Sequence, residues 1–230
     1  ASELAISFKS MATGNYDMTL ANVIGSSVVN ILLVIGIASI ISPISVKEQT
    51  VKNELPILLA ITFAFFIALN DTVFGAAKNG LSQIDAIILI IMFAFFLLYL
   101  FASVHFDKIT NVANIKDAAM PNKPQPIAIY ILLTLALIAL ASDIAVDNAV
   151  ALAKELHISQ KIIAMTVIVI GTSLPELIMT VNASRKGEHD LAVGNIIGTN
   201  IFNICVVLGL PTLIFGGFVS TSFNIIDTLV

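Results

Sequence analysis

The uncharged stretches of this sequence restrict it to one kind of fold. No Asp, Glu, Lys or Arg occurs between Leu191 and Ile226 or between Ala86 and Val104. Apolar segments of about 20 residues can cross the hydrocarbon core of a bilayer as helices. Because 58% of the 230 residues are hydrophobic and only 11% are charged, a soluble domain with a polar surface is excluded. The chain is expected to be an all-α, multi-pass integral membrane protein.

Charges, prolines and turn residues divide the chain into seven expected membrane segments. Their ranges are Glu3–Ala12, Thr19–Ile41, Pro56–Leu69, Ala86–Val104, Ile127–Leu156, Ile162–Ser184 and Leu191–Phe215. Residues 105–126 are rich in Lys, Asp, Asn and Pro, which is typical of a loop in solvent. This loop separates an N-terminal repeat, residues 1–104, from a C-terminal repeat, residues 127–230. Both repeats are expected to be incomplete, because the first segment is too short for a full span and Asn224–Val230 resembles the start of a further helix.

An internal repeat relates the two halves of the chain. Shifting the sequence by 173 positions aligns Glu3 with Glu176 and Ser26 with Thr199. The same register aligns Gly14 with Gly187, Asp17 with Asp190, Asn22 with Asn195, Gly25 with Gly198, Asn30 with Asn203 and Gly36 with Gly209. Apolar matches are frequent by chance in so hydrophobic a chain, but acids, amides and glycines that match in one register are not. The match therefore indicates a structural repeat.

The two repeats are expected to have opposite orientations. The Glu3 segment is the first expected span and the Glu176 segment is the sixth, so an odd number of crossings separates them. Inverted repeats that hold ions near the midplane, where helices are interrupted, are a recurring plan of secondary transporters. The sequence thus predicts a polytopic helical protein with two inverted-topology repeats.

Glu176 is the first candidate for a functional residue. It is the only charged residue between Ile162 and Ser184. A charge at membrane depth costs roughly 2.5–3.5 kcal/mol on insertion scales, so such residues mark ion or substrate pathways. Pro175 cannot donate its backbone N–H and disfavours helical geometry before it. We therefore expect a helix break at Thr172–Pro175 whose free carbonyl groups meet an ion. A hydrogen-bonded carboxyl pair without an ion is the alternative.

Oxygen donors gather in both copies of the repeat. Carboxylates, hydroxyls and carbonyls are hard ligands that suit Na⁺ or Ca²⁺, and Ca²⁺ takes about six to eight of them. The predicted donors include Glu3, Glu176, Ser26, Thr199, Thr172 and Ser173. Asn30 lies four residues after Ser26, and Asn203 four after Thr199, so each pair shares one helical face. Asn22 and Asn195 are expected to satisfy freed backbone groups around the broken helices, and a ligand role for them is the less favoured alternative.

Two segments resemble the signature motifs of the calcium/cation antiporter superfamily. They are Gly-Thr-Ser-Leu-Pro-Glu at 171–176 and Gly-Asn-Ile-Ile-Gly-Thr-Asn-Ile-Phe-Asn at 194–203. Over essentially its whole length the chain is similar to the prokaryotic sodium/calcium exchangers of that superfamily. The resemblance implies ten membrane helices in two inverted halves, and exchange of Ca²⁺ for Na⁺ by alternating access in a prokaryotic cell membrane, with no cofactor. Relative to that pattern, the chain is expected to lack helices at both ends.

The resemblance also implies a set of ion ligands. It places acidic ligands at Glu3 and Glu176, hydroxyl ligands at Ser26 and Thr199, amide ligands at Asn30 and Asn203, and Na⁺ ligands at Thr172, Ser173 and the carbonyl of Val169. The first copy departs from the pattern, since Ser2 stands where the family usually has Pro.

Two other transport functions remain open. A proton/calcium antiporter would use the same carboxylates, but that branch typically carries Gly-Asn-x-x-Glu around its acidic ligand. The Gly171–Glu176 segment therefore favours sodium. Asn at positions 30 and 203 argues the other way, because some sodium-dependent members have an acid at one of them. From a different class, a passive cation channel would conduct without counter-transport.

The remaining residues give little support to an enzyme or to a macromolecular partner. No His lies inside an expected span, and Asp143 and Asp147 share one helix, so a membrane-embedded protease is not expected. The net charge of −4 is scattered along the chain and indicates no nucleic-acid partner. The expected partners are Ca²⁺, Na⁺ and membrane lipid, and no protein partner is evident.

Overall fold

The computed structural model describes residues 2–71, 79–110 and 169–220, with only the backbone for residues 104–110. Between 129 and 168 it describes residues 129, 130, 133, 136, 137, 140, 144, 147, 148, 151, 152, 154–157, 162, 166 and 168. Within these ranges, four helices are long and apolar enough to cross a membrane: Tyr16–Ile41, Thr50–Leu69, Gln83–Ser103 and His189–Phe215. The expected all-α, multi-pass fold is confirmed.

The first repeat is a helical hairpin followed by two further helices. Helix α1 (Ser2–Ala12) leads into a rod made of α2 (Tyr16–Val29), the π-helical turn η1 (Asn30–Val34) and α3 (Ile35–Ile41). The next rod joins the π-helical turn η2 (Thr50–Glu54) to α4 (Leu55–Leu69), and α5 (Gln83–Thr110) follows. Large side chains on these rods face outward, as Leu32, Phe63 and Phe101 show with exposures of 70%, 64% and 73%. Such exposure is suited to lipid rather than water.

The second repeat reproduces the first in its described part. Helix α8 (Val169–Arg185) leads into a rod made of α9 (His189–Phe202), the π-helical turn η5 (Asn203–Leu208) and α10 (Gly209–Phe215). The helical hairpins turn at Gly14 and Gly187, whose φ angles are +73° and +74°. Glycine adopts this left-handed conformation without the cost that a Cβ would add. The π-helical turns begin at the matched residues Asn30 and Asn203, so the 173-residue register holds in three dimensions.

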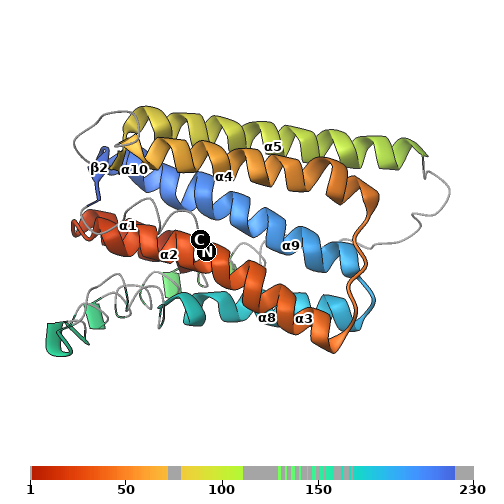
Figure 1. Cartoon of the computed structure of the whole chain (residues 1–230), viewed down its shortest axis with the longest axis horizontal. Helices are drawn as coiled ribbons and strands as arrows, with labels where there is room; N and C mark the ends of the chain where they lie inside the picture. Colours follow the sequence, from red (N-terminus) through yellow and green to blue (C-terminus); the bar gives the residue numbers. More distant parts are fainter. Residues whose placement is uncertain are drawn as a thin grey trace.

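The rods of the two repeats pack side by side (Figure 1). Helix α2 packs against α8 and η5, while α4 packs against α9, and α5 packs against η5 and α10. Fully buried side chains of these helices include Met18, Leu20, Ile61, Ile196, Ile201 and Leu208. Phe93 of α5 meets Phe202 of α9 edge to face, with ring centroids 5.9 Å apart. A two-stranded antiparallel ribbon, β1 (Gly80–Leu81) with β2 (Phe218–Val219), connects the start of α5 to the end of α10.

Two helices extend well beyond their expected limits, and one expected helix break is not observed. The α4 rod begins at Thr50 rather than Pro56, and α5 continues to Thr110 rather than ending at Val104. Both extensions are polar turns, because a helix can leave the hydrocarbon without losing its internal hydrogen bonds. The expected helix break at Thr172–Pro175 is wrong, since α8 is one continuous helix with Pro175 inside it. Packing against neighbouring helices makes an internal proline tolerable in a membrane helix.

Parts of two expected segments lie outside the described residues. They include residues 111–126 of the expected loop and Asp143 of the fifth segment. Asp147 is described, and its carboxylate lies 3.8 Å from the ammonium of Lys9, with 68% of its side chain exposed.

Candidate cation site

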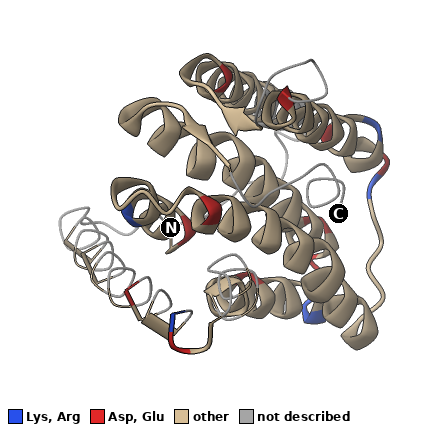
Figure 2. Ribbon diagram, turned by 60° about the vertical axis from the view of Figure 1, so that its left-hand side comes forward, with Lys and Arg blue, Asp and Glu red and all other residues tan. Residues whose placement is uncertain are grey.

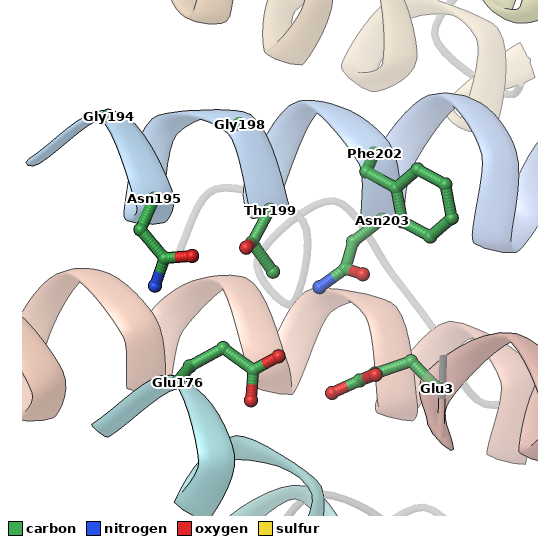
Figure 3. A pocket seen from close by; sticks show the side chains of 8 residues that line it. All are labelled: Glu3, Glu176, Gly194, Asn195, Gly198, Thr199, Phe202 and Asn203. Atoms are coloured by element: carbon green, nitrogen blue, oxygen red, sulfur yellow. The ribbon is translucent and has the colours of Figure 1, made fainter. Parts of the chain in front are cut away.

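A cavity of about 280 Å³ lies between the two repeats. It is lined by Glu3 of α1, Glu176 of α8 and six residues of the α9–η5 rod: Gly194, Asn195, Gly198, Thr199, Phe202 and Asn203. The carboxylates of Glu3 and Glu176 point toward one another across it (Figure 3). Glu3 is 3% exposed, and one carboxylate oxygen of Glu176, Oε2, is buried with no hydrogen-bond partner in the described part of the chain. Most charged residues lie near helix ends and connections, and the helix bodies are largely uncharged (Figure 2).

The α9–η5 rod presents one continuous face to the cavity. The lining positions recur in adjacent pairs four residues apart, which is the spacing of one helical face. A Cβ placed on Gly194 or Gly198 would meet no heavy atom of the described residues within 4 Å. These glycines therefore widen the cavity rather than permit close contact between helices, which is the other role that such spacing can have.

Asn203 connects the cavity to the opposite repeat. Its amide nitrogen, Nδ2, donates to Ser26 Oγ at 2.9 Å, and Ser26 Oγ donates to the carbonyl of Val23 at 3.1 Å. Ser26 is fully buried and does not line the cavity. The bond to Ser26 uses a donor of Asn203 and leaves its amide oxygen for another partner.

Asn30 does not occupy the position that the repeat predicts. Its Nδ2 donates to Asn200 Oδ1 at 3.1 Å, and its own Oδ1 is buried and meets no donor from the residues that the structure describes. In the other repeat the matched residue Asn203 donates to Ser26, the counterpart of Thr199. The two repeats thus share backbone geometry but differ in their side-chain hydrogen bonds.

The three predicted Na⁺ ligands lie in α8 away from the cavity lining. The hydroxyl of Thr172 donates to the carbonyl of Val169 at 3.2 Å, so these two predicted ligands bond to each other. Ser173 is 2% exposed, and its hydroxyl has no partner among the described residues. The cavity therefore brings together four of the nine predicted residues, Glu3, Glu176, Thr199 and Asn203. It does not include Ser26, Asn30, Thr172, Ser173 or Val169.

Asn195 lines the cavity, although the sequence pattern favoured a bond to backbone groups over a ligand role for it. Its Nδ2 donates to the side chain of Thr180 at 3.2 Å and not to a backbone group. Asn22 behaves as expected, since its Nδ2 donates to the carbonyl of Glu3 at 3.2 Å. The four-residue spacing from Asn195 to Thr199 places both on one face of α9, which is the signal that could have identified Asn195.

The donor set of the cavity consists of oxygen atoms on carboxylate, hydroxyl and amide groups. No group of three or more His, Cys, Asp or Glu side chains that could hold a metal occurs in the described part of the chain. Oxygen donors of this kind bind hard cations such as Na⁺ and Ca²⁺ and not thiolate-seeking metals.

Comparison with known proteins places the sequence in a family. The family model described as "Sodium/calcium exchanger protein" matches residues 1–102 and 126–229. CaxA of Alkalimonas amylolytica is 35% identical over 225 residues, which are 96% of this chain and 68% of CaxA. The inner membrane protein YrbG of Escherichia coli is 34% identical over 220 residues, which are 94% of this chain and 66% of YrbG. The chain thus spans about two thirds of the length of these curated relatives.

A solved exchanger structure resembles the whole chain. NCX_Mj, a sodium-calcium exchanger from Methanococcus jannaschii, was solved after soaking with 2.5 mM Na⁺ and 1 mM Sr²⁺. It is 30% identical to this chain with a TM-score of 0.60, and the match covers 100% of this chain and 72% of that one.

Proposed function

Because the chain belongs to the sodium/calcium exchanger protein family, a family of transporters and not of enzymes, we propose that the full-length protein exchanges Ca²⁺ for Na⁺ by alternating access. Residues 1–104 and 127–230 contribute its two inverted halves, joined by residues 105–126. The ions bind near the membrane midplane between Glu3 and Glu176, the matched acids of the two repeats.

The observation that carries this proposal is the pair of matched carboxylates facing one oxygen-lined cavity. Two carboxylates in a low-dielectric environment repel one another, and a divalent cation between them balances both charges. Thr199 and Asn203 add a hydroxyl and an amide oxygen on the same face of the α9–η5 rod. Sodium is favoured as the counter-ion by the Gly171–Glu176 segment and by the name of NCX_Mj.

Competition for the same carboxylates couples the two ions. When Na⁺ occupies Glu3 and Glu176, Ca²⁺ loses its principal ligands, so the two cations bind alternately and are exchanged rather than cotransported. Ser26, Asn30, Thr172, Ser173 and the Val169 carbonyl are the remaining proposed ligands. They enter the site in another state of the cycle, after the Asn203–Ser26, Asn30–Asn200 and Thr172–Val169 hydrogen bonds open.

Ca²⁺ uptake into proteoliposomes tests the function. The full-length protein is reconstituted, and uptake is compared under an outward Na⁺ gradient and an outward H⁺ gradient. We expect the Na⁺ gradient to drive uptake and Glu176→Gln to abolish it, because the variant removes a charge that balances Ca²⁺. Glu188→Gln is the matched control, since Glu188 is exposed in the turn before α9 and lies outside the cavity.

Other outcomes would assign a different function. Uptake driven only by H⁺ would make the protein a proton/calcium antiporter that uses the same carboxylates. Uptake that needs no counter-ion gradient and survives Glu176→Gln would indicate a channel and would show that the proposed site is wrong.

A further inference from the structure

The carboxamide of Asn195 is held in one orientation. Its Nδ2 donates to Thr180 Oγ1 at 3.2 Å, and Thr180 is fully buried in α8. Because the nitrogen is directed at α8, the oxygen of the same planar amide is directed elsewhere. Figure 3 shows this oxygen pointing along the cavity toward the hydroxyl of Thr199.

The first repeat contains an equivalent side-chain hydrogen bond, but its asparagine does not reach the cavity. Asn22, the counterpart of Asn195, donates to Ser7 Oγ at 3.3 Å, and Ser7 is the counterpart of Thr180 in the 173-residue register. Asn22 is fully buried, however, and does not line the cavity. An anchor found in both repeats is a packing contact between neighbouring helices. The approach of the amide oxygen to the cavity is a separate property of Asn195.

We propose that Asn195 is a cation ligand, whose amide oxygen completes a subsite with the Glu176 carboxylate and the Thr199 hydroxyl for a hard cation, Ca²⁺ or Na⁺. All three residues line the same cavity, and Asn195 and Thr199 lie one helical turn apart on α9. The Oε2 atom of Glu176 supplies a carboxylate oxygen that has no hydrogen-bond donor among the described residues. This inference rests on the proposed function and adds to it a ligand from the α9 residue one turn before Thr199.

Equilibrium binding of radiolabelled Ca²⁺ to the full-length protein in detergent tests the ligand role. Asn195→Leu removes the oxygen and is expected to weaken Ca²⁺ affinity by about tenfold or more. Asn195→Asp keeps an oxygen and adds a charge, so it is expected to bind Ca²⁺ at least as tightly as the unmodified protein. Thr180→Val removes only the anchor and is expected to weaken binding less than Asn195→Leu. Ion-free melting temperatures and size-exclusion profiles identify variants that fail to fold.

The outcomes separate a ligand from a packing residue. The ligand role is supported if Asn195→Leu weakens Ca²⁺ affinity and Asn195→Asp does not. Equal losses in Asn195→Leu and Asn195→Asp, or an unchanged affinity in Asn195→Leu, would overturn it. If the unmodified protein binds Ca²⁺ and Glu176→Gln abolishes that binding, the proposed function stands whatever the Asn195 variants show. Absence of Ca²⁺ binding by the unmodified protein would overturn the proposed function, and the ligand role with it.

Discussion

At the scale of single residues, Gly198 shows how a missing side chain shapes the cavity. Within the described structure, a Cβ at this position would meet no heavy atom within 4 Å, so Gly198→Ala adds a methyl group to the cavity without a clash there. We expect lower Ca²⁺ uptake, because the methyl group competes with the ion for space. The melting temperature should be unchanged or higher, since Ala favours a helix over Gly by about 1 kcal/mol.

Gly36→Ala is the matched control for this prediction. Gly36 also lies within a helix with open space around its Cα, but in α3 and outside the cavity lining. Both variants should gain helix stability, and only Gly198→Ala should lose transport. Equal transport by the two variants would mean that the cavity has room to spare at Gly198.

At the scale of elements, the α8–α9 hairpin depends on the left-handed conformation of Gly187. Gly187 lies just after the end of α8 with a φ of +74°, and its N–H donates to the carbonyl of Ser184. Gly187→Ala should destabilise the protein by about 1–2 kcal/mol, because an L-residue pays this cost in the left-handed region. Gly187→Asn should cost less, since Asn tolerates that conformation. Melting temperatures in ion-free detergent should fall in the order Gly187, Gly187→Asn, Gly187→Ala. Equal melting temperatures for the two variants would contradict this prediction.

At the scale of the whole molecule, matched residues connect the repeats at both ends of the rods. Lys47 forms an ion pair with Asp190 at the start of α9, and Ser220 donates to Asp17 at the start of α2 at 2.9 Å. Asp17 matches Asp190 and Lys47 matches Ser220 in the 173-residue register. Figure 1 places the starts of α2 and α9 at opposite ends of the helical layer. In each case a residue after the rod of one repeat bonds to an aspartate at the start of the other repeat's rod.

The two contacts should respond differently to salt. The Lys47 and Asp190 side chains are 67% and 47% exposed, so Lys47→Gln should cost no more than about 1 kcal/mol and nothing at high salt. The Ser220–Asp17 bond is partly buried, so Ser220→Ala should cost about 1 kcal/mol at any salt concentration. Melting temperatures in low and high choline chloride measure this, because choline avoids adding Na⁺ to the proposed site.

Lys52→Gln controls for the general effect of removing a lysine. Lys52 pairs with Glu48 within its own segment and does not connect the repeats. A salt-dependent loss for Ser220→Ala, or a salt-independent one for Lys47→Gln, would reverse the assignment of the two contacts.

Much of the helix layout could be predicted from the sequence, because it depends on properties that are local or periodic. Uncharged stretches such as Ala86–Val104 leave few alternatives to a membrane helix, and α1 and α10 end at the expected residues, Ala12 and Phe215. The effect of Pro175 could not be predicted in this way. Its consequence depends on how firmly the neighbouring helices hold α8, and those contacts are not local.

The kinds of residue in the candidate site could be predicted from the sequence, but which of the candidates line the cavity could be predicted only in part. Glu3, Glu176, Thr199 and Asn203 line the cavity as a repeat with acidic and polar positions suggests. Ser26 and Asn30 have the right spacing but are used in hydrogen bonds to Asn203 and Asn200. Spacing defines which residues share a helical face, whereas the rotation of that helix and the choice of hydrogen-bond partner define where the face points.

By itself, the sequence determined that this chain is helical, embedded in a membrane and built from two inverted copies of one motif. Those conclusions follow from the length of apolar segments and from matched residues, which any fold of the chain must respect. Only the tertiary structure decided that the matched acids meet in one cavity, that Asn195 joins them, and that α8 stays continuous. Each of these depends on contacts between segments more than 100 residues apart or between packed helices, where small rotations decide which polar atoms meet.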